Sequence, residues 1–273
     1  MNSSINRICL VVVSSLIPAF STLAFAQKGP APVLPPVTAF EQIVVPTNAN
    51  LYQLSARETV NRTLDVETIA AQNQRVFDGL ALFKPRTLPK RKDGVSMTEA
   101  LEVLNDAATS EVVGYAQHAK YDPKQNIGFC FGRAMFIHLD LLTRKVNKSS
   151  VYKAFIVGSM KSGGITWGFH VATVVRSDDG QFYAIDPNFG WIMTVREWFD
   201  YYAAMDVDKK LRIFIAPASK FGPSARKYTP FDMKDKFYNK YFEDMLQYYR
   251  LAALKRLAEE GKFPEVGAPK GAR

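Results

Sequence analysis

The chain has 273 residues, of which 47% are hydrophobic and 12% aromatic, and this composition favours a packed core and excludes a disordered protein. The formal net charge is +9, but Lys and Arg are spread along the chain, apart from KPRTLPKRK at 84–92, and no nucleic-acid-binding motif accompanies them. The charge therefore indicates a weakly cationic surface and not a nucleic-acid partner.

The first 26 residues have the pattern of a secretory signal peptide. Arg7 precedes the apolar run ICLVVVSSLIPAF, and Ala24 and Ala26 form a small-x-small cleavage site before Gln27. The run is too short, and too interrupted by Ser and Pro, to span a bilayer, and no later stretch approaches the roughly 20 apolar residues of a membrane helix. We therefore expect an exported protein, periplasmic or secreted, with no stable membrane insertion.

The region that follows is expected to be extended at first and then helical. Residues 27–38 contain four prolines and predict an exposed tail. Residues 55–83 have a helical pattern with Ser55 as N-cap, and the basic stretch 84–94 predicts a loop. In 96–119 a helix is expected to begin with Ser96 as N-cap and Glu99 completing a capping box.

The second half of the chain predicts a central helix followed by an antiparallel sheet. The helix begins near Cys130, with apolar residues at helical spacing after it. Strands are expected at 151–160, 167–177, 181–187 and 211–217, with a hairpin turn at 178–180, a short helix at 194–205 and a long amphipathic helix at 230–263. The order predicts an α+β fold. We divide the chain into the signal peptide (1–26), an N-terminal region (27–94), a core (95–228) and a C-terminal helix with its tail (229–273).

Cys130 is the only cysteine after the signal peptide, so the mature chain can form no disulfide. A single cysteine in an oxidising compartment is open to oxidation and to wrong pairing, and its presence needs a reason. One explanation is burial as a small hydrophobic residue. The other is nucleophilic catalysis, because a helix N-terminus favours the thiolate through its free N–H groups and its dipole.

A nucleophilic cysteine needs a base, and the chain has three histidines. His138 follows Cys130 by two helical turns, about 12 Å along the axis, which is too far to share a proton. His118 falls in a predicted helix end or loop. His170 remains, on a predicted strand, and Asp186 at the end of the next strand is expected to orient its imidazole.

The pairing register of these two strands decides whether His170 and Asp186 can meet. Facing residues of an antiparallel pair have position numbers with a constant sum, and a sum of 356 or 358 places the two side chains on one face. A sum of 357 or 359 would place them on opposite faces. A structural histidine and an ordinary Asp-Pro turn remain open as alternatives.

Three segments in this order resemble the secreted bacterial protein-glutaminases, a family of papain-like and transglutaminase-like cysteine hydrolases. The segments are GFCFGRA (128–134), WGFHVATVV (167–175) and AIDPNF (184–189), and the resemblance covers roughly residues 125–200. It implies a Cys130, His170, Asp186 triad in a papain-like core with extra N- and C-terminal helices. It also implies hydrolysis of glutamine side chains in proteins or peptides, without a metal or other cofactor.

The same resemblance implies further site residues. The backbone N–H of Cys130 would bind the oxyanion together with the side-chain amide of Gln125 or Asn126. Trp167 and Phe169 are candidates for the substrate pocket. Members of the family are made with an inhibitory pro-segment, and residues 27 to about 92 are either such a segment or a permanent helical subdomain.

Two features depart from that family, because those glutaminases contain disulfides and the long C-terminal helix is extra. The sequence therefore leaves three other functions open. A papain-like cysteine peptidase or a transglutaminase-like acyltransferase would use the same triad. A non-catalytic binding module would bury Cys130 and dock a partner through the long helix.

Overall fold

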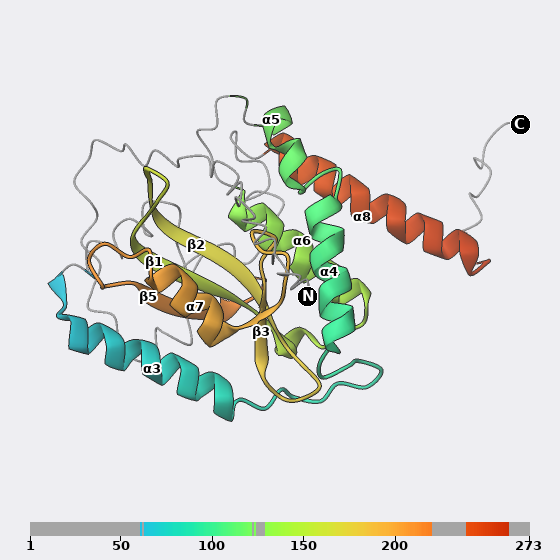
Figure 1. Cartoon of the computed structure of the whole chain (residues 1–273). Coiled ribbons are helices and arrows are strands. Elements are labelled where there is room, and N and C mark those ends of the chain that lie inside the picture. The colour runs from blue at the N-terminus through green and yellow to red at the C-terminus, as the bar shows by residue number, and fades with distance from the viewer. Residues whose placement is uncertain (1–60, 62, 122, 124–128, 220–238, 262–273) are drawn as a thin grey trace, which may run out of the picture.

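The computed structural model describes the whole chain except residues 1–60, 62, 122, 124–128, 220–238 and 262–273 (Figure 1). The predicted signal peptide and proline-rich tail lie outside the described residues, as do Ser55, Gln125 and Asn126. Within the described residues, no helix is long and apolar enough to cross a membrane.

The centre of the molecule is an antiparallel sheet of five strands in the order β4-β3-β2-β1-β5. The strands are β1 (Val151–Ser162), β2 (Ile165–Arg176), β3 (Phe182–Ile185), β4 (Met193–Thr194) and β5 (Arg212–Pro217). The predicted α+β class is confirmed, and the four predicted strands are present. Strand β4 was not predicted because two residues are too few to show a period.

Turns with glycines in the left-handed region connect the first three strands. Gly163 and Gly164, at φ of 54° and 84°, lie between β1 and β2. Gly180, at φ of 88°, lies in the turn between β2 and β3, where its N–H donates to the carbonyl of Ser177. Glycine adopts these conformations without a steric penalty, so both turns form in the short segments that the sequence provides.

Helices cover both faces of the sheet (Figure 1). Helices α4 (Met97–Thr109), α6 (Cys130–Thr143) and α8 (Asn239–Glu259) share one apolar core. Helices α3 (Val66–Leu82) and α7 (Val195–Ala203) share another core with the opposite face. Since α6 is enclosed between the sheet and its two neighbours, its first nine residues are all buried.

Helix α3 is bound to the sheet by its own side chains. The Asn73 amide donates to the carbonyl of Leu211 at 2.8 Å and accepts the N–H of Ile213 at 3.0 Å, at the edge strand β5. The following loop is also anchored, because the Asn147 amide donates to the carbonyl of Arg86 at 2.6 Å and to Asp93 at 2.8 Å. The described part of the N-terminal region therefore packs as part of the same domain as the sheet.

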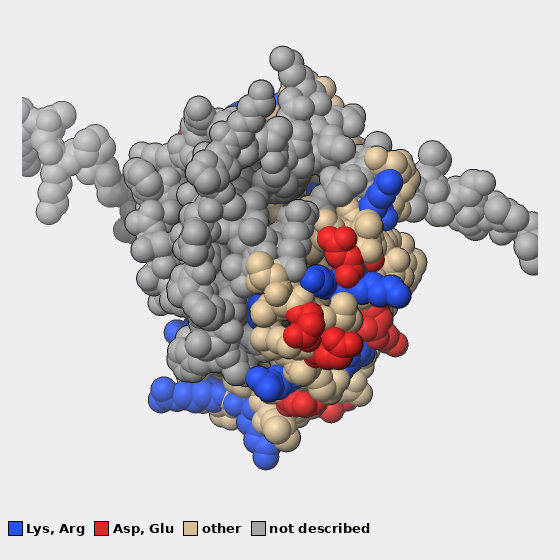
Figure 2. All heavy atoms as spheres, turned by 90° about the vertical axis from the view of Figure 1, so that its left-hand side faces the viewer, with Lys and Arg blue, Asp and Glu red and all other residues tan. Residues whose placement is uncertain are grey.

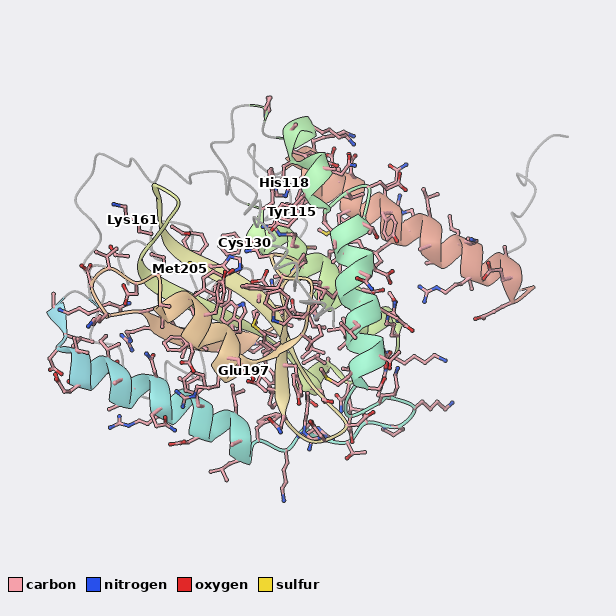
Figure 3. All side chains as sticks on the ribbon, in the orientation of Figure 1. Tyr115, His118, Cys130, Lys161, Glu197 and Met205 are labelled. Carbon is pink, nitrogen blue, oxygen red and sulfur yellow. The ribbon has the colours of Figure 1, made fainter. Side chains whose placement is uncertain are left out.

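The helix predicted within 96–119 is shorter than that stretch. Ser96 caps α4 through the N–H of Glu99, as expected, but α4 ends at Thr109. The hydroxyl of Ser110 then accepts the N–H groups of Val112 and Val113, which turns the chain. The chain continues as a short 3-10 helix, η1 (Tyr115–Gln117), and helix α5 (His118–Tyr121), which together lie beside the start of α6 (Figure 3).

Helix α8 contacts the domain through its first half. Tyr241, Phe242 and Met245 are buried in the core that contains α6, whereas Leu251 and Leu254 are exposed. The helix therefore packs onto the core through its first turns. In the described part of the face shown in Figure 2, basic and acidic residues are interspersed.

Candidate active site

The register of β2 and β3 brings His170 and Asp186 together. Thr173 pairs with Ile185, which gives a position sum of 358, one of the two sums that place both side chains on one face. Strand β3 ends at Ile185, so Asp186 follows directly after its last paired residue. The Nε2 atom of His170 lies 2.7 Å from Oδ2 of Asp186.

Cys130 interacts with the same imidazole. It is the first residue of α6, and the N-cap residue Phe129 makes no side-chain capping bond, so no cap side chain satisfies the first-turn N–H groups. The side chains of Cys130 and His170 interact, and this interaction raises the pKa of His170. Because Nε2 faces Asp186, Nδ1 is the ring nitrogen that is left for the thiol. The structure thus brings all three predicted triad residues together, and Cys130 is at the same time buried in an apolar cluster.

Asp186 is held by four donors. Its Oδ2 atom accepts from His170, from the indole N–H of Trp198 at 2.9 Å and from the hydroxyl of Tyr202 at 3.1 Å, and its Oδ1 atom accepts the backbone N–H of Asn188 at 3.1 Å. Burial raises the pKa of Asp186, but the charge of His170 and these bonds outweigh it and hold the pKa below its ordinary value. The buried carboxyl is therefore ionised.

The same pair sets the charge of the imidazole. Burial lowers the pKa of His170, whereas the charge and hydrogen bond of Asp186, together with the hydrogen bond to Cys130, raise it to about 9. The imidazole is consequently protonated at neutral pH in this arrangement. A protonated imidazole beside a thiol favours the thiolate.

A second group of side chains, from η1, α5 and α6, lies at the start of α6. Figure 3 shows Tyr115 and His118 beside Cys130. Arg133, one turn after Cys130, is buried, with Nη1 2.6 Å from Nε2 of His118 and Cζ 4.6 Å from the centre of the Tyr115 ring. Burial and the charge of Arg133 lower the pKa of His118 to about 4, so the neutral imidazole accepts this hydrogen bond.

The remaining candidates are placed as follows. Phe169 is 3% exposed and packs against Phe131 in the cluster that contains Cys130, so it is a core residue beside the nucleophile. Trp167 belongs to β2, but its side chain, like Gln125 and Asn126, lies outside the described residues. His138 is buried farther along α6, away from the triad.

Sequence reasoning missed five residues of this site: Tyr115, His118, Asn188, Trp198 and Tyr202. Trp198 and Tyr202 had a signal, because they are four residues apart on a predicted helix and each combines an aromatic body with one hydrogen-bond donor. His118 had no local signal, since its contact with Arg133 depends on the turn after α4.

Comparisons with known proteins found no relative of this chain. The chain matches no protein-family model, and neither the curated proteins nor the solved structures contain a significant match. Within the described residues, no three His, Cys, Asp or Glu side chains are grouped so that they could hold a metal ion. The chemistry of the site must therefore be argued from its own residues.

Proposed function

We propose that the protein is a cysteine-dependent amidohydrolase that deamidates glutamine side chains in proteins or peptides. The observation that carries the proposal is that the His170 imidazole is bonded to Asp186 at 2.7 Å and also interacts with the Cys130 side chain. A helix that begins at the cysteine and packs on an antiparallel sheet bearing the histidine supports a papain-like or transglutaminase-like core. The three motifs that resemble the protein-glutaminases supply the choice of substrate.

The reaction then has two halves. The Cys130 thiolate attacks the carboxamide carbon, forms a C–S bond and moves the carbonyl electron pair onto oxygen. When the C=O bond re-forms, the C–N bond breaks and His170 gives its proton to the departing ammonia, which leaves a thioester. His170 next takes a proton from water as the water attacks the thioester, and the C–S bond breaks to give glutamate and the thiolate.

Asp186 holds the imidazole throughout this cycle. Its bond to Nε2 orients the ring and leaves Nδ1 for the sulfur, and its negative charge stabilises the imidazolium that is present before the first proton transfer and after the second. The backbone N–H of Cys130 is the first donor to the oxyanion. The resemblance adds Gln125 or Asn126 as a second donor.

The decisive experiment measures ammonia release and new N-termini after incubation of the mature protein with casein or a short glutamine peptide. We expect ammonia without cleavage, and no ammonia from the Cys130→Ala variant. His170→Ala should be equally inactive, whereas Lys161→Met, at an exposed position of β1, should retain full activity.

Other results would identify the alternatives. Cleavage without ammonia would indicate a cysteine peptidase, and incorporation of an added primary amine into casein would indicate an acyltransferase. If iodoacetamide modifies Cys130 only after unfolding, the enzymatic functions are excluded and a binding module remains.

A further inference from the structure

Tyr115 brings an unsatisfied hydroxyl into the site. The oxygen is buried, and no described residue hydrogen-bonds it. Buried polar atoms in folded proteins are nearly always paired, so an unpaired hydroxyl beside a nucleophile needs a specific explanation.

The Tyr115 ring is fixed on two sides. The guanidinium of Arg133 lies over one face, 4.6 Å from the ring centre, and the His118 ring is centred 5.2 Å away. Arg133 and His118 are in turn joined by the 2.6 Å hydrogen bond between Nη1 and Nε2. The hydroxyl is thus held in place by contacts to its ring alone.

Tyr115 lies near the triad, close enough to be affected by its charges (Figure 3). Burial raises the pKa of Tyr115, and among the nearby charges Asp186 and Cys130 raise it further while Arg133 lowers it. Tyr115 therefore remains protonated and able to donate at any pH at which the triad operates.

The titratable and charged groups around Arg133 are Tyr115, His118, Cys130, Asp186 and Tyr241.

Arg133 adds a positive charge to the same space. It is 5% exposed, and no described carboxylate lies within ion-pair distance of it. Because Asp186 and the protonated His170 balance each other, the charge of Arg133 favours one further negative charge in the site. Cys130 supplies that charge as a thiolate, and the oxyanion carries it after attack.

We propose that Tyr115 donates its hydroxyl hydrogen to the oxyanion formed when Cys130 adds to the carboxamide carbon, and that Arg133 and His118 position its ring. The inference rests on the proposed acyl-transfer reaction. This role explains why the Tyr115 hydroxyl has no hydrogen-bond partner, because the oxyanion that would accept its hydrogen exists only during the reaction. The hydrogen stays on Tyr115, and the C–S and C–N bonds form and break as described above.

The test uses the mature chain with Tyr115→Phe, which removes only the hydroxyl. We expect kcat for ammonia release to fall about 100-fold with little change in KM, the effect of losing one oxyanion donor. The rate at which iodoacetamide alkylates Cys130 should not change, because alkylation forms no oxyanion. The matched control is Tyr183→Phe, which removes a hydroxyl that donates to Asp179 on the surface and should leave both rates unchanged.

Two further variants examine the positioning residues. Arg133→Met should lower kcat at least as much as Tyr115→Phe, and Arg133→Lys should recover part of the loss because the ammonium still lies over the ring. When Tyr115 is already Phe, Arg133→Met should have a much smaller additional effect on kcat.

Each other outcome contradicts the proposed role of Tyr115. Full activity of Tyr115→Phe would remove the role of the hydroxyl and leave the proposed function intact. An equal loss of alkylation and ammonia release would show that Tyr115 acts on the nucleophile and not on the oxyanion. A variant that fails to fold would show that the hydroxyl has a structural partner. If the wild-type protein releases no ammonia, cleaves nothing and transfers no acyl group, the proposed function fails, and the role of Tyr115 fails with it.

Discussion

The indole N–H of Trp198 and the imidazole Nε2 of His170 meet at the same carboxylate oxygen, Oδ2 of Asp186, at 2.9 and 2.7 Å. Trp198 belongs to α7, which packs on the face of the sheet opposite α6. The orientation of the imidazole is therefore determined by a helix as well as by the strand that carries it. Helix α7 in turn is fixed at its start by a complete capping box between Thr194 and Glu197.

Replacement of Trp198 by Phe should weaken this support. The ring volume is largely retained, but the carboxylate loses one of its four donors, and a lost hydrogen bond to a buried charge costs about 1.5–3 kcal/mol. We expect a free energy of unfolding lower by that amount in urea titrations, and a kcat at least about 10-fold lower. Trp191→Phe is the control, because Trp191 is 55% exposed. Equal effects of the two variants would contradict this role for Trp198.

The raised pKa of His170 predicts how stability changes with pH. The folded protein holds this proton up to about pH 9, and the unfolded chain only to about 6.5, so the His170–Asp186 pair stabilises fully below 6.5 and loses its effect as pH rises to about 9. The difference in unfolding free energy between wild type and His170→Gln should shrink across this interval. Taking the difference cancels the contributions of other titrating groups. A difference that stays constant would show that His170 is neutral in the fold.

Local patterns in the sequence were sufficient to single out Cys130, His170 and Asp186 but not the residues around them. Cys130 was found because a helix start is visible in apolar spacing, and the short hairpin turn permitted a register that brings His170 and Asp186 together without fixing it. The contacts of Trp198 and Tyr115 depend on how α7 and η1 pack against other parts of the fold. Local periodicity does not predict packing between segments that are distant in the sequence. The end of α4 was misjudged because the Ser110 hydroxyl satisfies N–H groups that would otherwise have continued the helix.

Lys153 is completely buried in β1, and its removal should stabilise the protein. Burial lowers its pKa well below 10.5, so folding must remove a proton that the unfolded lysine keeps. The contribution of Lys153 to stability therefore becomes less unfavourable as pH rises to 10.5. Lys153→Met removes this cost. At a pH between the folded and unfolded pKa values of the lysine, the cost is about 1.4 kcal/mol for each pH unit below 10.5.

The measurement is urea unfolding of Lys153→Met and wild type at several pH values. The gain in unfolding free energy should grow as pH is lowered from 10.5, until the pKa of the folded lysine is reached. Lys161→Met, at an exposed position of the same strand, should change stability by no more than about 0.5 kcal/mol. Destabilisation by Lys153→Met at every pH would contradict this prediction.

Gly132, in the first turn of α6, lies against Tyr241 of α8. A β-carbon at this position would lie 1.7 Å from Cε1 of Tyr241. Alanine normally stabilises a helix by about 1 kcal/mol relative to glycine, but here the overpacking should reverse the sign and cost about 1–3 kcal/mol. Gly190→Ala, where a β-carbon meets nothing within 4 Å, is the control and should not lower stability.

A double-mutant cycle shows whether the contact with Tyr241 causes that loss. Tyr241→Ala alone should cost about 3–5 kcal/mol, as removal of a large buried ring does. It also makes room for the new methyl group, so Gly132→Ala should cost much less when Tyr241 is already Ala, and the double variant should be more stable than the sum of the single effects predicts. Ammonia release should fall in Gly132→Ala, because the displaced Tyr241 ring packs against the helical turn that begins at Cys130. Additive effects would mean that α8 does not press on the start of α6.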